Sequence, residues 1–321
     1  MAAHGGGEFN LFVALERYGL ILIWVAIAII FSFIRPDVFL QWTTVSLILG
    51  SQTVLVVLAL SLMIPLIAGD FDLSVAAIMT LASMIFAIMS QRLGISLPIA
   101  ILAVLGAALV AGLVNALFIV YFGVNSLIVS LGTGTFISGL VLWISNSQTI
   151  SGVYRPLVHF LIVQRIFGIP TVFYGGLILC LGLWYLFNRT KLGLDILFVG
   201  RNREVARLTG VNVEAVRVAC LVASAIGAAI AGVFYVGTTG AADPTSGLNM
   251  LLPAFAAVFL GSTVLTPGRF NGLGTLVAVY FLTTGITGLT MLGIQTYVQN
   301  LFYGGALVIA VTLSQLAAKQ R

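Results

Sequence analysis

Two aspartates stand together between strongly apolar segments. Asp70 and Asp72 lie in the stretch AGDFDLSVA, residues 68–76. An ionisable group at membrane depth costs about 2.5 to 3.5 kcal/mol on insertion scales, so such groups tend to face a cavity or an interface. The pair could therefore line a transport pathway. Asp72 could equally cap a helix that begins at Leu73, where backbone N–H groups and the helix dipole favour a carboxylate. The two roles are compatible, and the sequence leaves both open.

A second acidic break occurs at Asp243, in the stretch AADPTSG, residues 241–247. Asp before Pro commonly opens a turn, so this pattern favours an outside loop over a pathway residue. Both acidic breaks precede a short apolar segment, and they lie roughly half the chain apart. This spacing raises the hypothesis of two related halves, as in transporters built from inverted repeats.

A basic and polar segment follows in the middle of the chain, at 200–213, GRNREVARLTGVNV. Asn202 is a good N-cap, Gly210 suits the position after a helix end, and Val205 and Leu208 form an apolar edge. The pattern predicts a helix of about two turns. Four charged side chains would project from it: Arg201, Arg203, Glu204 and Arg207. This charged surface suits insertion into a groove of a cytoplasmic partner, although the residues alone favour a solvated loop that sets orientation.

The chain lacks the motifs of several enzyme classes. A phosphate-binding GxxxxGK[ST] loop needs a lysine after a glycine, and neither Lys191 nor Lys319 follows one. No HExxH zinc motif and no GxSxG nucleophile motif occurs. The two cysteines, Cys180 and Cys220, fit no metal or redox spacing and are interpreted as packing residues. The sequence therefore predicts a protein that is not an enzyme, with no ATPase site, cofactor or metal of its own.

The elements that position these residues must be membrane-spanning helices. The chain has 321 residues with only 14 Lys+Arg and 9 Asp+Glu, and its mean hydropathy is +1.18. A soluble chain of this length would carry roughly 80 charged residues. Charge-free stretches of 62 and 49 residues run over 93–154 and 270–318. Because a spanning helix needs about 20 apolar residues, each stretch must contain at least two spans.

Breaks at Gly, Pro and polar clusters predict an all-α, polytopic membrane protein with about ten spans. The expected spans are 18–34, 43–68, 73–90, 96–121, 126–145, 170–187, 214–237, 251–265, 272–290 and 295–316. The eighth is short for a full crossing, which favours a broken or re-entrant segment. Residues 18–316 are thus expected to form a single membrane domain, with terminal tails at 1–17 and 317–321.

Orientation rests on the loop 189–213 and its edges. Six of the fourteen basic residues occur there: Arg189, Lys191, Arg201, Arg203, Arg207 and Arg217. Short loops rich in Lys and Arg stay cytoplasmic. With ten spans, this places both tails in the cytoplasm.

Polar side chains within or beside the spans are candidates to line a pathway or gate. They are Asp70, Asp72, Ser74, Asn115, Asn125, Asp243 and Asn249, with Gln52, Thr133 and Asn300 as further candidates. Each is as well suited to hydrogen bonding between helices.

Three separated stretches carry a resemblance to a known family. They are LIAGDFDLSVAAIMTLASM at 66–84, KLGLDILFVGRNREVARLTGVNV at 191–213 and ADPTSGLNMLLPAFAAVFLGSTVLTPGRFNGLGT at 242–275. In order and spacing they resemble the membrane permeases of ribose-type ABC sugar importers. The resemblance covers nearly the whole chain.

The resemblance implies a permease subunit of the bacterial inner membrane that imports a monosaccharide or similar small polar solute by alternating access. Its implied partners are a second permease copy or close relative, cytoplasmic subunits that bind ATP and Mg, a periplasmic or lipoprotein binding protein, and membrane lipid, with no nucleic acid. The segment 200–213 would be the coupling helix that docks on the ATPase. The residues implied in coupling are Arg201, Asn202, Arg203, Glu204, Val205, Arg207, Leu208 and Gly210.

Departures from the family pattern leave the solute open. The family usually has Gly at Asp70 and Ala76, is richer in Gly around 262–267, and more often has Ala at Glu204 or Val205. A purine nucleoside, polyol or autoinducer importer would look much alike. An alternative function is an ion-coupled secondary transporter that uses Asp70, Asp72 or Asp243. An intramembrane enzyme is disfavoured because the acidic residues are scattered.

Overall fold

The computed structural model describes residues 11–295 and 297–319, with the backbone alone described at 11–16 and 313–319. Among these residues, eight helical segments are long and apolar enough to cross a membrane. They are Arg17–Ile34 in α1 (Leu11–Ile34), Trp42–Ile67 in α3 (Trp42–Ser51) and α4 (Thr53–Ile67), Val75–Arg92 in α5 (Val75–Ala87) and η1 (Ile88–Arg92), Leu97–Tyr121 in α6 (Leu97–Ala116) and η2 (Leu117–Tyr121), α7 (Ser126–Ser145), α9 (Thr171–Arg189), α12 (Val213–Thr239) and α14 (Gly272–Met291).

Two shorter apolar helices complete the bundle: α13 (Leu248–Gly261) and Tyr297–Thr312 of α15 (Tyr297–Lys319). The connections contain α2 (Pro36–Phe39), α8 (Arg155–Val158), η3 (His159–Val163), α10 (Lys191–Arg201) and α11 (Arg203–Leu208). Two short antiparallel pairs occur, β1 (Ile150–Ser151) with β4 (Ala241–Ala242) and β2 (Arg165–Ile166) with β3 (Ile169–Pro170). The predicted all-α polytopic class is therefore confirmed.

The ten predicted spans correspond to these eight segments and two shorter helices. The eighth span was expected to be short, and α13 has 14 residues. The span expected at 43–68 is divided at Gln52, where α3 ends and α4 begins. Of the expected N-terminal tail, 1–10 lies outside the described residues, whereas 11–17 already belongs to α1. At the other end α15 continues to Lys319, past the expected limit of 316.

The core of the bundle is built around α4 and α12. Every residue of α4 is buried, and α12 packs against α4, α5 and α6. Small residues allow the close approach: a Cβ on Gly232 would lie 2.4 Å from the Met79 carbonyl oxygen. Close backbone approach provides the van der Waals contact that lipid cannot supply between helices.

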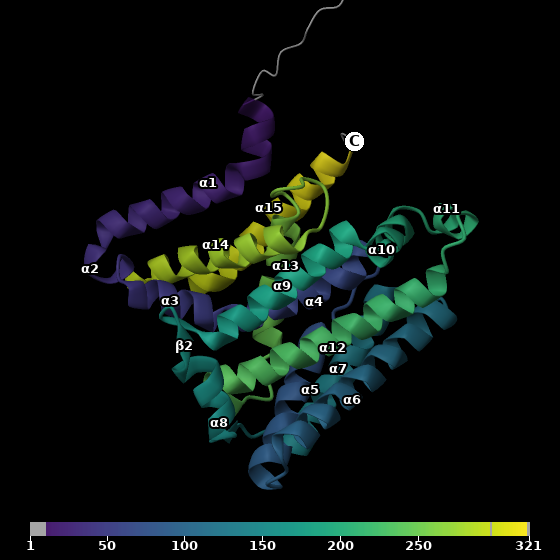
Figure 1. The fold of residues 1–321 in the computed structure, drawn as a ribbon, viewed down its shortest axis with the longest axis horizontal. Helices are drawn as coiled ribbons and strands as arrows, with labels where there is room; N and C mark the ends of the chain where they lie inside the picture. Colours follow the sequence, from purple (N-terminus) through teal and green to yellow (C-terminus); the bar gives the residue numbers. More distant parts are fainter. Residues whose placement is uncertain (1–10, 296, 320–321) are drawn as a thin grey trace, which may run out of the picture.

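The connections gather alternately at two ends of the bundle, as the predicted topology requires (Figure 1). At one end α11 lies near the connection between α4 and α5, and the Phe71 backbone N–H donates to Ser126 Oγ over 3.0 Å. At the opposite end β1 pairs with β4, and Arg35 donates to the Met291 carbonyl oxygen over 3.3 Å. We call these the α11 end and the β1 end.

The two acidic breaks meet inside the bundle. The helices that follow them are α5, which begins at Val75, and α13, which begins at Leu248. The Gly247 backbone N–H donates to Thr80 Oγ1 over 3.0 Å. A Cβ on Gly247 would lie 2.2 Å from the Ala76 carbonyl oxygen, so only glycine fits this contact. The hypothesis of two inverted-repeat halves stays a prediction.

The helix α5 begins inside the bundle, some distance from the α11 end. A Cβ on Gly134 would lie 3.3 Å from the Ser74 Cα atom. Gly134 is the ninth residue of α7, which begins at Ser126, so it lies about 12 Å from that helix end at 1.5 Å per residue. The segment 70–74 therefore carries the chain from the α11 end into the bundle.

Candidate functional site

The helix predicted at 200–213 is present as α11, which spans Arg203–Leu208. The Asn202 side chain caps it by accepting hydrogen bonds from the backbone N–H groups of Glu204 and Val205, over 3.0 and 3.1 Å. Gly210 has a φ of +85°, the left-handed conformation that suits the residue after a helix end. The predicted local structure of this segment is confirmed, whereas its role in coupling stays a prediction.

One side of α11 is anchored and the other faces outward. Ala206 is buried against Val199 and Val213. Leu208 is 87% exposed and Val205 is 52% exposed, so the predicted apolar edge is presented away from the bundle. Solvent-exposed apolar side chains in a charged setting suit an interface with another protein.

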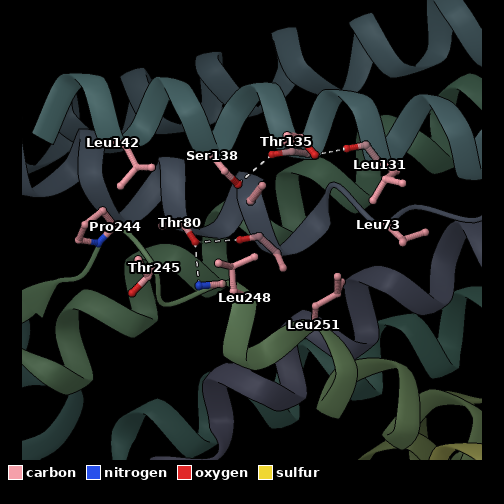
Figure 2. Close-up of a pocket in the computed structure, with 14 residues that line it drawn as sticks. Leu73, Thr80, Leu131, Thr135, Ser138, Leu142, Pro244, Thr245, Leu248 and Leu251 are labelled. Atoms are coloured by element: carbon pink, nitrogen blue, oxygen red, sulfur yellow. Dashed lines mark hydrogen bonds between the residues drawn. The ribbon is translucent and has the colours of Figure 1, made fainter. Parts of the chain in front are cut away.

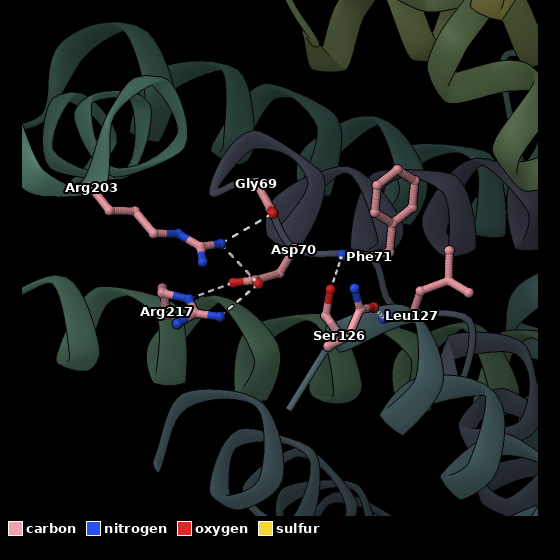
Figure 3. Close-up of polar contacts among 8 residues, drawn as sticks. Gly69, Asp70, Phe71, Ser126, Leu127, Arg203 and Arg217 are labelled. Carbon is pink, nitrogen blue, oxygen red and sulfur yellow. Dashed lines mark hydrogen bonds and ion pairs between the residues drawn. The ribbon is translucent and has the colours of Figure 1, made fainter. Parts of the chain in front are cut away.

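Asp70 lies under α11 and is bound by two arginines (Figure 3). Arg217 of α12 donates from Nε to Oδ2 and from Nη2 to Oδ1, each over 2.7 Å. Arg203 of α11 donates from Nη2 to Oδ1 over 3.0 Å and to the Gly69 carbonyl oxygen over 3.1 Å. The Asp70 side chain is 3% exposed, compared with 13% for Arg217 and 41% for Arg203. A buried carboxylate thus joins three elements: the α4–α5 connection, α11 and α12.

A close backbone contact supports this cluster. A Cβ on Gly200 would lie 1.8 Å from the Ile67 carbonyl oxygen, so glycine is required where α10 meets the end of α4. Gly69 has a φ of +79°, which turns the chain beyond α4 toward Asp70. The sequence at 67–70 and at 200–203 is therefore folded together as one unit.

Asp72 lies deeper and is fully buried. It accepts hydrogen bonds from the Ser74 backbone N–H at 3.0 Å, from Ser74 Oγ at 2.6 Å and from Ser224 Oγ at 3.1 Å. Asp72 therefore lies at the N-terminus of α5, although that helix begins at Val75 rather than at Leu73 as predicted.

A chain of hydrogen bonds continues from Asp72 across three helices. Asn115 Nδ2 of α6 donates to Ser74 Oγ over 2.7 Å, and Thr133 Oγ1 of α7 donates to Asn115 Oδ1 over 2.7 Å. In low dielectric such satisfied networks fix the relative positions of helices. The structure thus brings together four of the predicted candidates, and Arg217 and Asp70 continue the same polar region toward α11.

The remaining candidates lie apart from this network. Asn125 caps α7 by accepting from the Leu127 N–H over 2.9 Å. Asp243 accepts from the Thr245 N–H and hydroxyl over 2.8 and 2.9 Å in the turn before α13, and Asn249 is exposed near the start of α13. Within the described residues, no group of three or more His, Cys, Asp or Glu could hold a metal ion.

Sequence reasoning did not pair the aspartates with α12. Arg217 and Ser224 are seven residues apart, so they share one face of a helix. That face places Arg217 against Asp70 and Ser224 against Asp72. The available signal was a lone arginine in the first two turns of an apolar span, where a buried partner is expected.

Comparison with known proteins gives consistent matches. Residues 44–311 match the family described as "Branched-chain amino acid transport system / permease component". The chain is 29% identical to the D-allose transport system permease protein AlsC of Escherichia coli (strain K12), over 97% of this chain and 95% of that protein. It is 31% identical to the autoinducer 2 import system permease protein LsrD of Yersinia enterocolitica, over 79% of this chain and 78% of that protein. No solved structure gave a significant match.

Proposed function

This chain belongs to the branched-chain amino acid transport system / permease component family, as a multi-pass permease of the bacterial inner membrane, and we propose that its solute is a monosaccharide or a similar small polar molecule. The relatives named for D-allose and autoinducer 2 support this solute class. A permease needs no ATPase site of its own, because separate subunits that bind ATP and Mg supply the energy.

The observation that carries the proposed coupling mechanism is the contact between Arg203 and Asp70. The exposed edge of α11, with Val205 and Leu208, is the docking surface for the ATPase subunit. Arg203 on the same helix holds Asp70, which begins the segment 70–74 that enters the bundle. A displacement of α11 therefore pulls directly on the start of α5. Rigid-body movement of packed helices is the expected response, because packed cores move between discrete arrangements.

The proposed assembly has the α11 end in the cytoplasm, with both termini on the same side. A second permease, identical or closely related, completes the pathway. A binding protein delivers the solute at the β1 end. Asp70 and Asp72 act in this mechanism as positioning residues for α5 and α12.

The test is an ATPase assay on the complete transporter in lipid nanodiscs. The variant carries Glu204→Ala and Arg207→Ala, two exposed charges of α11. We expect it to fold normally but to lose docking of the ATPase or its stimulation by loaded binding protein. The matched control is Arg269→Ala, an exposed basic residue that lies outside α11. Unchanged docking and turnover in the α11 variant would refute the proposed coupling role.

The ion-coupled alternative makes an opposite prediction. Uptake would continue in ATP-depleted vesicles with a proton gradient and would stop with Asp72→Asn. The comparisons support the ATP-driven class instead. In the structure both oxygens of Asp70 are bound by guanidinium groups, which favours a fixed structural role over reversible ion binding.

A further inference from the structure

A pocket opens where the two acidic breaks meet (Figure 2). It lies between the start of α5, the middle of α7 and the segment that leads into α13, and its cavity volume is about 130 Å³. Figure 2 shows Thr80, Ser138 and Leu248 around the same space. This volume accommodates several water molecules or one small solute.

Hydroxyl groups from three elements line the pocket: Thr80 on α5, Thr135 and Ser138 on α7, and Thr245 before α13. Each hydroxyl already donates its proton within its own segment. Thr80 donates to Ala76 O over 3.0 Å and Thr135 to Leu131 O over 2.8 Å. Ser138 donates to Gly134 O and Thr245 to Asp243 Oδ1, each over 2.9 Å. A hydroxyl oxygen that has donated its proton still has acceptor capacity. Thr80 Oγ1 already accepts from the Gly247 N–H over 3.0 Å, so Thr135, Ser138 and Thr245 offer the acceptors for the hydroxyl groups of a solute.

The rest of the lining is aliphatic, from residues such as Leu73, Ala77 and Leu251, and no ionisable side chain of the described residues lines the pocket. A charged solute would lose its hydration there without gaining a partner, which is costly. A neutral molecule with hydroxyl groups and C–H faces would find both acceptors and apolar contact. The few acceptors would hold it weakly, as passage requires.

The pocket is mechanically connected to the Asp70 cluster. Leu73 lines the pocket and lies only three residues after Asp70. On the opposite wall Gly247 contacts Ala76 and Thr80 directly. Any movement of 70–74 that shifts α5 against the α13 break must therefore change the shape of this pocket.

From this geometry we propose that the pocket is a transit site for a neutral, polyhydroxylated solute, an inference that rests on the proposed transport function. Its wall residues Thr135, Ser138 and Thr245 contact the solute. The rim includes Leu131 and Leu248, which are 53% and 69% exposed, so the site is open on one side of this chain. In the proposed assembly the second permease subunit, identical or closely related, closes this open side.

The test measures whether water and sugars reach the pocket. Ser138→Cys and Phe136→Cys are compared in the complete complex in proteoliposomes, with iodoacetamide as a small neutral alkylating reagent. Phe136 is on the same helix, is 73% exposed and does not line the pocket. Alkylation needs the thiolate, which forms in water and not in lipid. The native Cys180 and Cys220 are buried, and the alkylation of the unmodified complex gives the background rate of reaction.

We expect Ser138→Cys to react at least tenfold faster than Phe136→Cys. D-allose, D-ribose or D-glucose should slow that reaction, whereas D-glucose 6-phosphate should not. Equal reaction rates for the two variants, protection by none of the sugars, or equal protection by the phosphate ester would overturn the proposal.

A filling variant provides a second measurement. Ser138→Leu should lower ATP-driven sugar uptake at least tenfold with the complex still assembled, and Phe136→Leu should not. Unimpaired uptake with Ser138→Leu would count against the pocket. If the unmodified complex takes up sugar with ATP while Ser138→Cys is unreactive, the proposed transit site is refuted and the proposed transport function is retained. If sugar protects Ser138→Cys from alkylation but sugar uptake does not need ATP, the proposed ATP-driven function is refuted and the proposed transit site is retained.

Discussion

Replacing Asp70 with Asn isolates the energetic role of the buried carboxylate. The change removes the charge while nearly preserving the shape, and it leaves Arg217 facing a neutral amide. Arg217 is only 13% exposed, and breaking a buried pair from one side costs about 3 to 5 kcal/mol. Arg203 is 41% exposed, so its share is that of a surface pair, below about 1 kcal/mol. We therefore expect a loss of about 3 to 5 kcal/mol for Asp70→Asn, and below about 1 kcal/mol for Arg203→Gln.

The assay is a denaturant titration in detergent micelles, followed by the fluorescence of the four tryptophans. Arg217→Gln should cost about as much as Asp70→Asn, and the double variant should cost no more than either, because the unpaired charge is then absent. Asp37→Asn, at an exposed aspartate, is the control. A loss below about 1 kcal/mol for Asp70→Asn, or additive losses in the double variant, would refute the reasoning.

Three further predictions concern other contacts. Leu208→Asp should abolish binding of the ATPase subunit in a pull-down from nanodiscs. It should change the free energy of unfolding by at most about 0.5 kcal/mol, because the side chain is 87% exposed. Retained binding would contradict the docking role. Gly200→Ala should lower the free energy of unfolding by about 1 to 3 kcal/mol through overpacking against Ile67. Gly182→Ala should not, because no described residue lies within 4 Å of the added Cβ; equal free energies of unfolding for the two variants would contradict the contact. Asn115→Leu should cost about 1 to 3 kcal/mol in the same titration because it removes one buried and one partly buried hydrogen bond between helices, and an unchanged midpoint would show that the network is dispensable.

Local patterns were sufficient to predict much of the fold. Apolar length located the spans, and the cap at Asn202 and the glycine at 210 defined α11 because capping depends on a few adjacent residues. The short eighth span followed from the same counting, and α13 confirms it.

The pairings within the site could not be predicted, because they join distant parts of the chain. Asp70 and Arg217 are 147 residues apart, and Gly247 and Thr80 are 167 apart. Hydropathy contains no information on which helices become neighbours. The start of α5 was placed two residues too early because Asp72 resembled an N-cap, whereas its carboxylate is shared between Ser74 and Ser224 from another helix. The pocket was not predicted either, since it exists only where two breaks meet.

The pairing of β1 with β4 has a consequence for how such a permease can diversify. Ile150–Ser151 pairs with Ala241–Ala242 through backbone groups, and the N–H groups of Gly152 and Val153 both donate to the Gly240 carbonyl oxygen, over 3.1 and 3.2 Å. These backbone bonds do not depend on the exposed side chains of the β1 end. Gly152 and Gly240 have positive φ angles that favour glycine, and Ile150, Val153 and Ala242 are buried in the core. The exposed side chains of the β1 end can therefore change over evolution without rebuilding the helices that they cover.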